Sequence, residues 1–113
     1  MADSCLFCRI ARHEIPSTVV AEDEGLMAFR DVHPQAPTHI LIIPKAHVGS
    51  LNDLGEFDLT ARMMRMAVVL AEQEGMAQRG YRVVINTNAD GGQTVFHLHL
   101  HLLGGRSLGW PPG

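Results

Sequence analysis

The fold and the chemistry of this chain both follow from one segment, Val95-Phe96-His97-Leu98-His99-Leu100-His101-Leu102-Leu103. Apolar residues and histidines alternate along it, which is the pattern of a β-strand with one face in the core. We therefore predict a strand over residues 95–103 whose core face consists of Phe96, Leu98, Leu100 and Leu102. The opposite face then carries His97, His99 and His101, with successive rings about 6.6 Å apart.

A row of three histidines on one strand face has three interpretations. It can be a polar face that happens to use histidine, although lysine, threonine or glutamate would serve equally well there. It can be a metal site, because His-x-His on a strand can present two nitrogens to one ion. It can also be a nucleophilic site, in which one imidazole attacks phosphorus or an acyl carbon while another shares protons with the leaving group.

The turn before this strand favours the nucleophilic interpretation with a phosphate-containing substrate. Asp90-Gly91-Gly92-Gln93-Thr94 combines backbone N–H groups that no side chain covers with a hydroxyl. Loops of this kind cradle phosphate oxygens. Asn86 can add an amide donor if its strand pairs with the histidine strand. A Gly-Gly pair alone is typical of a plain hairpin turn, so the inference depends on the histidines that follow.

The rest of the chain predicts an α+β domain built on an antiparallel sheet. A short helix is expected over residues 4–12 with Ser4 as its N-cap. A long helix is expected over residues 58–76, where an apolar stripe consists of Leu59, Met63, Met66 and Leu70. The other predicted elements are strands at 18–22, 26–29, 39–43 and 81–86, a proline-rich loop at 31–38, a turn at 89–92 and an irregular tail at 104–113.

Composition points to a single domain over residues 1–113 and excludes several classes of protein. Apolar residues make up 46% of the 113 residues and charged residues 19%, which is typical of a globular domain. The net charge of −3 argues against a nucleic-acid-binding surface. No apolar run approaches the roughly 20 residues of a membrane span. We expect a reducing cytoplasm, since Met1-Ala2-Asp3-Ser4 lacks the signal-peptide pattern and two cysteines cannot build a disulfide scaffold.

Two thiols lie one helical turn apart in the segment Cys5-Leu6-Phe7-Cys8. In a reducing compartment Cys-x-x-Cys is often half of a zinc site, but two cysteines of an ordinary core would show the same spacing. A tetrahedral site needs two further ligands, for which His47 and His97 are candidates.

The sequence resembles the histidine triad (HIT) superfamily, whose signature is His-φ-His-φ-His-φ-φ with φ apolar, and residues 97–103 match it in full. The resemblance covers nearly the whole chain and is to the Hint branch, the histidine triad nucleotide-binding proteins. The segments that carry it are Phe29-Arg30-Asp31, Pro34-Gln35-Ala36-Pro37-Thr38-His39, Ile43-Pro44-Lys45, Gly91-Gly92-Gln93-Thr94 and Trp110-Pro111-Pro112-Gly113.

This resemblance implies a HIT-like fold with one long and one short helix, in a homodimer whose two sheets join. It also implies hydrolysis of a purine nucleoside 5′-phosphoramidate to an amine and the nucleoside monophosphate. His99 would be the nucleophile that forms a nucleotidyl-histidine, His101 would assist proton movement, and His39 would support the nucleophile from a buried position.

The same resemblance implies the residues that hold the nucleotide and a metal ion. The phosphate would be contacted by Asn86, Gly92 and Thr94, and the ribose hydroxyls by Asp31, with His33 at the ribose edge. The base pocket would consist of Leu6, Phe7, Ile10, Phe29 and Leu41. A structural zinc ion would be bound by Cys5, Cys8, His47 and His97, and the chemistry itself would need no cofactor.

Two other functions are compatible with the sequence. A nucleotide-binding or scaffolding dimer with little turnover would use the same pocket. A zinc-dependent hydrolase would use the histidine row as metal ligands, although no aspartate or glutamate lies close to the row in sequence to act as general base.

Overall fold

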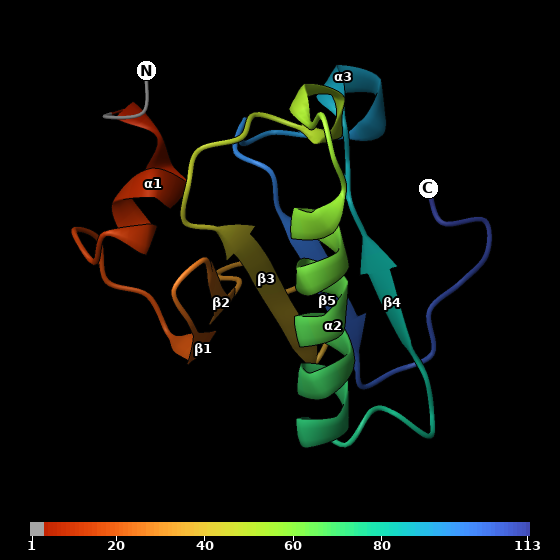
Figure 1. Cartoon of the computed structure of the whole chain (residues 1–113). Coiled ribbons are helices and arrows are strands. Elements are labelled where there is room, and N and C mark those ends of the chain that lie inside the picture. Colours follow the sequence, from red (N-terminus) through yellow and green to blue (C-terminus); the bar gives the residue numbers. More distant parts are fainter. Residues whose placement is uncertain (1–3) are drawn as a thin grey trace.

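The computed structural model describes residues 4–113, so Met1 to Asp3, on which the signal-peptide expectation rests, lie outside the described residues. An antiparallel sheet of five strands, in the order β1-β2-β3-β5-β4, forms the centre of the fold (Figure 1). The strands are β1 (Val19–Glu22), β2 (Leu26–Arg30), β3 (Thr38–Pro44), β4 (Tyr81–Val84) and β5 (Leu100–Gly104). The predicted α+β class and the hairpin of the first two strands are confirmed.

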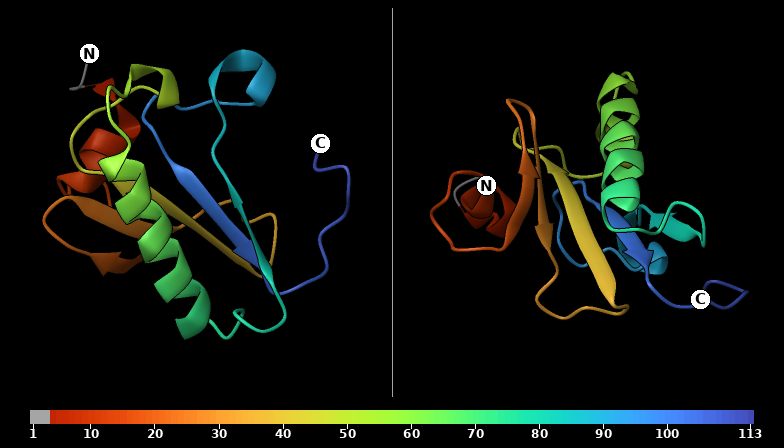
Figure 2. Two further views of the ribbon diagram at one scale, coloured as in Figure 1. Left: turned by 45° about the vertical axis from the view of Figure 1, so that its right-hand side comes forward. Right: turned by 90° about the horizontal axis from the view of Figure 1, so that it is seen from below.

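Two helices cover opposite faces of this sheet, as the right-hand view of Figure 2 shows. They are the short α1 (Leu6–Ala11) and the long α2 (Asp58–Gln73). Two smaller elements are a 3-10 helix at Leu51–Asp53 and α3 (Asn88–Gly91). Within residues 4–113, none of the helices has the length and apolar character needed to cross a bilayer.

Alternating side chains of the central strands fill two separate cores, one under each helix. On the α2 side, Ile40 and Ile42 of β3 belong to the same buried cluster as Met63 and Leu70. On the α1 side, the intervening Leu41 and Ile43 pack with aromatic and aliphatic residues of α1. Because β3 is buried on both faces, its apolar run is continuous, and each fully buried side chain of this size stabilises the fold by about 1.5–3 kcal/mol.

The apolar stripe predicted for the long helix is confirmed. Met63 and Leu70 are buried, and Leu59 and Met66 pack against the same core. The helix ends at Gln73, three residues before the predicted end, because Gly75 adopts a left-handed conformation with φ of 75°. Its C-terminal carbonyls accept hydrogen bonds from the N–H groups that follow, including that of Met76 to Ala71.

The histidine strand is shorter than predicted. β5 begins at Leu100, whereas the prediction began it at residue 95. Leu98 donates its N–H to the Val48 carbonyl at 2.6 Å, so residues before Leu100 are held by a loop and not by a strand. The alternation still places Leu98, Leu100 and Leu102 in the α2-side core, but Phe96 is 55% exposed and does not belong to it.

Other boundaries also differ from the predictions, most of them by one or two residues. Cys5, and not Ser4, is the N-cap of α1, because its sulfur accepts the N–H of Cys8 at 3.4 Å. β4 ends at Val84, two residues before the predicted end of that strand. The predicted turn at 89–92 contains most of α3, which ends at Gly91 and is followed by its C-cap Gly92 in a left-handed conformation with φ of 89°.

Candidate active site

A cavity of about 440 Å³ lies between α1, the edges of β2 and β3, and the segment that leads into β5. Its wall is mostly apolar, and all five predicted base-pocket residues line it, namely Leu6, Phe7, Ile10, Phe29 and Leu41. Its polar lining includes Asp31, His33, Thr94, His99 and His101. The cavity therefore combines a surface suited to a flat apolar group with a polar end.

Several lining residues escaped the sequence prediction. Ile15, Pro16, Ser17, Val32 and Val95 also border the cavity. The connections after α1 and after β2 bring the first four there, and these connections have no periodic pattern from which a facing direction can be read. Val95 comes from the segment that leads into β5. A sequence feature that could have indicated a cavity-lining position is the apolar Ile15 beside Pro16, between a predicted helix and a predicted strand.

The ring orientation of His99 is set by the backbone of the same segment. Its Nδ1 lies 2.7 Å from the carbonyl oxygen of His97. A carbonyl can only accept, so Nδ1 carries the proton and Nε2 keeps its lone pair. Phe7 packs edge-on against the ring, with centroids 5.1 Å apart. His99 thus has a defined tautomer, with its unprotonated nitrogen on the side of the ring away from the backbone.

His39 and His101 form a second hydrogen-bonded unit beside His99. The N–H of Gln35 donates to Nδ1 of His39 at 3.0 Å, so neutral His39 carries its proton on Nε2. That nitrogen lies 2.9 Å from Nδ1 of His101 and 3.4 Å from Oδ2 of Asp31. His101 Nδ1 is therefore the acceptor and its Nε2 carries the proton. The rings of His101 and His99 have centroids 5.0 Å apart.

Burial keeps this histidine unit uncharged. Burial lowers the pKa of His101 to about 4, and the neighbouring His99 and His39 contribute to the same shift. Burial also lowers the pKa of His39, although the nearby Asp31 carboxylate opposes the change. At neutral pH His101 is a neutral ring that can donate a hydrogen bond through Nε2.

Acidification from pH 7 to pH 4 is expected to lower the free energy of unfolding. The unfolded chain takes up a proton at His101 near the ordinary pKa of 6.5, whereas the folded chain takes it up near 4, so stability is lost as the pH falls through that interval. One such group gives a slope of roughly 1.4 kcal/mol per pH unit. Urea unfolding of the chain and of His101→Gln at several pH values measures the slope.

The same substitution at an exposed histidine provides the control for this experiment. His13 lies on the surface beside Glu22. The variant His13→Gln should keep the slope of the parent chain, and His101→Gln should flatten it. Equal slopes for the parent and His101→Gln would contradict the assignment.

His97 does not share the cavity with the other two histidines of the row. Its Nε2 donates to the Pro44 carbonyl at 2.7 Å, which leaves Nδ1 unprotonated. Nδ1 lies 3.3 Å from the sulfur of Cys5 and 3.4 Å from that of Cys8. The expected common face therefore divides into two sites, with His97 in one and His99 and His101 in the other.

The two cysteines, His47 and His97 form a cluster that can hold a metal ion. Their four ligand atoms all lie within 4.8 Å of one another, and Nδ1 of His47 lies 3.2 Å from the sulfur of Cys8. Two sulfurs and two imidazole nitrogens are a donor set suited to a tetrahedral ion. The bond from His97 Nε2 to the Pro44 carbonyl already orients that ring for binding through Nδ1.

A second set of potential ligands, Asp31, His39 and His101, is also close enough to hold an ion. Its hydrogen bonding opposes that use. The Gln35 N–H occupies the lone pair on Nδ1 of His39, so an ion on Nε2 would require both ring nitrogens to be unprotonated. These residues are therefore suited to hydrogen bonding, which disfavours the alternative of a hydrolase with metal on the histidine row.

The predicted phosphate residues have a mixed placement. Thr94 lines the cavity, whereas Asn86 and Gly92 are not among its lining residues. They lie beside each other, since a Cβ at Gly92 would be 3.9 Å from Nδ2 of Asn86. The N–H groups of Gly92 and Gln93 donate to carbonyls of Ala89 and Asn88. These two amides are engaged in the turn, so the expected cradle of uncovered N–H groups is not formed by them.

Gln93 organises this turn, which the sequence prediction did not anticipate. It is buried, and its amide accepts from the Asn88 N–H and donates to the carbonyls of Gly49 and Val95. Three bonds to separated backbone groups hold the segment before β5 in place. Gln93 thereby positions Thr94 at the edge of the cavity.

Comparison with known proteins places this geometry in one family. A family model described as "HIT domain" matches residues 12–108. The purine nucleoside phosphoramidase of Escherichia coli (strain K12) is 52% identical over 111 residues, covering 96% of this chain and 93% of the relative. A 14 kDa zinc-binding protein of Zea mays is also 52% identical, over 113 residues, covering 96% and 87%. The crystal structure of a HIT family hydrolase from Legionella pneumophila Philadelphia 1 matches with a TM-score of 0.95 and 56% identity, covering 97% of this chain and all of that one.

Proposed function

This chain belongs to the HIT domain family, and we propose that it hydrolyses a purine nucleoside 5′-phosphoramidate to the nucleoside monophosphate and an amine. The observation that carries the proposal is the bond from Nδ1 of His99 to the His97 carbonyl, because it leaves Nε2 as a nucleophile at a cavity with an apolar wall. The name of the Escherichia coli relative supports the same substrate class.

The reaction divides into two displacements at phosphorus. Nε2 of His99 attacks, the P–N bond breaks, and the amine leaves with a proton from solvent or substrate. A water molecule then attacks the nucleotidyl-histidine, the bond from phosphorus to Nε2 breaks, and the nucleoside monophosphate leaves. In the intermediate the ring is positively charged, and the bond from its Nδ1 proton to the His97 carbonyl stabilises that charge.

His101 and His39 act through hydrogen bonds in this scheme. With a pKa of about 4, His101 stays neutral, so its Nε2 proton suits a bond to a phosphoryl oxygen better than transfer to the leaving group. His39 holds Nδ1 of His101 at 2.9 Å and so fixes which nitrogen carries that proton. In this proposal Asp31 and Thr94, which line the cavity, bind the ribose hydroxyls and the phosphate respectively. Asn86 and Gly92, which lie outside the cavity lining, are proposed as further phosphate contacts.

Zinc at the cysteine cluster would serve the structure and not the reaction. Cys5, Cys8, His47 and His97 would hold it, joining α1 to the loop after β3 and to the histidine segment. The ion would anchor His97, whose carbonyl orients His99. The name of the Zea mays relative supports this metal.

We also propose a homodimer in a reducing cytoplasm. β4 is an edge of the sheet, and Val83 on it is exposed, so a second copy can extend the sheet there. Two cysteines that form no disulfide and contact histidine rings support a reducing compartment. Sedimentation equilibrium tests the dimer, and a mass equal to one chain would contradict it.

The function is tested by trapping the intermediate. The chain is mixed with adenosine or guanosine 5′-phosphoramidate, quenched in the first turnover and digested for mass spectrometry. We expect nucleotide mass on the peptide that contains His99 and release of the amine at the same rate as the monophosphate. A chain that binds the nucleotide but neither releases amine nor gains mass is a binding protein and not this enzyme.

A further inference from the structure

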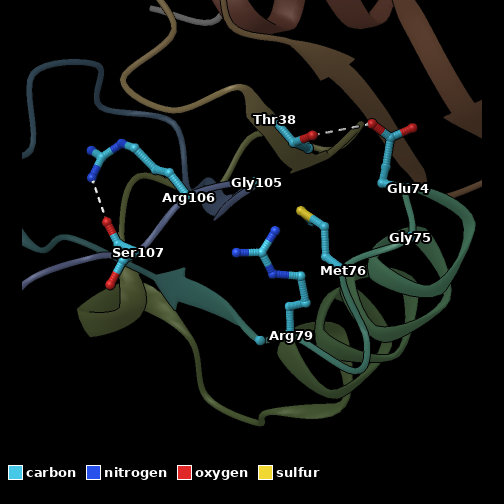
Figure 3. Close-up of a pocket in the computed structure, with 9 residues that line it drawn as sticks. Thr38, Glu74, Gly75, Met76, Arg79, Gly105, Arg106 and Ser107 are labelled. Atoms are coloured by element: carbon cyan, nitrogen blue, oxygen red, sulfur yellow. Dashed lines mark hydrogen bonds between the residues drawn. The ribbon is translucent and has the colours of Figure 1, made fainter.

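A second cavity, of about 250 Å³, lies at the other end of the sheet from α3, between the end of α2, the start of β3 and the chain after β5 (Figure 3). Its lining includes Arg79, Arg106 and Ser107. An adjoining hollow of about 280 Å³ shares these three residues and adds Arg82. Three arginines thus surround one small region of a chain whose net charge is −3.

Arg79 is the unpaired cation of this region. Within residues 4–113 its guanidinium makes no hydrogen bond or ion pair. Figure 3 shows it lying between Met76 and the segment of Arg106 and Ser107, facing into the cavity. Arg79 is exposed at the edge of the cavity, and an arginine that is not paired with an anion retains all its directional donors for a ligand.

Arg106 is held in place but retains donors. Its Nη2 donates to the Gln35 carbonyl at 2.8 Å and its Nη1 to the Ser107 carbonyl at 2.9 Å. The guanidinium has more N–H donors than these two carbonyls use. Because the side chain is already ordered, a ligand that binds it loses little additional side-chain entropy.

The acidic group in the cavity wall does not cancel this positive charge. Glu74 receives two hydrogen bonds of 3.0 Å from Arg30 and one from Thr38. The Arg30 guanidinium keeps the pKa of Glu74 below its ordinary value. Arg30 therefore offsets the carboxylate, and the charges of Arg79 and Arg106 remain.

We propose that the cavity of Arg79, Arg106 and Ser107 is a binding site for a phosphate group, either inorganic phosphate or a phosphomonoester, separate from the nucleotide cavity. A tetrahedral phosphate can accept hydrogen bonds from two guanidinium groups and a hydroxyl at once. A carboxylate has only two acceptor oxygens, both in one plane, so it can accept hydrogen bonds from fewer directions than a phosphate.

The test is an NMR titration of the full chain with inorganic phosphate at constant ionic strength, with adenosine, which has no phosphate group, present throughout to occupy the nucleotide cavity. We expect saturable amide shifts at Gly80, Gly105 and Ser107. Arg79→Gln should weaken the fitted affinity by about tenfold or more, because one charged donor group is lost. Arg65→Gln removes the same charge from an exposed position of α2 and should leave the affinity unchanged.

Two kinds of outcome overturn the proposal. Shifts that do not saturate, or that are equal in the chain and in Arg79→Gln, show that Arg79 holds no phosphate. Acetate that saturates the same amides at the same concentration shows that the cavity does not select phosphate. A parallel titration with glucose 1-phosphate distinguishes a phosphomonoester, if it binds more tightly than inorganic phosphate, from inorganic phosphate as the preferred form. None of these results depends on phosphoramidate hydrolysis.

Discussion

Replacing His99 with glycine is expected to lower kcat for phosphoramidate hydrolysis by about 10³-fold or more. Removal of a catalytic nucleophile typically costs at least this much, because no other group can form the covalent intermediate. In this chain His101 cannot substitute, since its Nδ1 accepts the His39 proton and its Nε2 carries a proton of its own. Steady-state release of the amine measures the loss.

Two controls separate chemistry from folding in this experiment. Phe7 and Phe29 stay in place around the removed ring, so AMP should still bind to His99→Gly within a few-fold of the parent affinity. His33→Gly removes a second histidine that lines the same cavity and should retain most of the turnover. If His99→Gly hydrolyses the substrate at the parent rate, the covalent mechanism is wrong.

Replacing His47 with asparagine is expected to weaken zinc binding by about 100-fold and to lower the zinc-dependent part of stability. Such a loss equals about 2.7 kcal/mol at saturating zinc, and for a domain of this size it lowers the unfolding midpoint by roughly 10 °C. His47 is exposed, so its substitution removes a ligand without opening a cavity in the core. Calorimetry with excess zinc measures the shift.

The linkage between metal and folding supplies the controls. With a strong chelator present, the parent and His47→Asn should unfold at the same temperature, because the lost stability belongs to the bound ion. His13→Asn is the control because it changes another exposed histidine. Asparagine tolerates the backbone φ of 61° at that position. This variant should keep the zinc-dependent increase in unfolding temperature. Either of two results would refute the structural zinc site. One is purified parent protein that contains no zinc, and the other is a difference in unfolding temperature between the parent and His47→Asn that is as large with the chelator as with zinc.

Periodicity alone determined much of this fold. Two periodic patterns identify the buried side chains: the apolar stripe of α2 and the alternation around His97, His99 and His101. That is why the α+β class, the position of the long helix and the core face of Leu98, Leu100 and Leu102 were predictable. The base-pocket residues were predicted only through the family resemblance, since their spacing is equally typical of an ordinary core.

Tertiary structure alone decided how the three histidines are used. Alternation predicts which face a side chain occupies, but not which backbone group meets its ring. The carbonyl of Pro44 turns His97 toward the cysteines, the carbonyl of His97 orients His99, and the N–H of Gln35 sets the proton on His39. One of these partners, Pro44, is remote in sequence from the ring that it meets, and a carbonyl or N–H is common to nearly every residue type. A sequence therefore carries no sign of these bonds, whereas the folded chain assigns each ring nitrogen its proton.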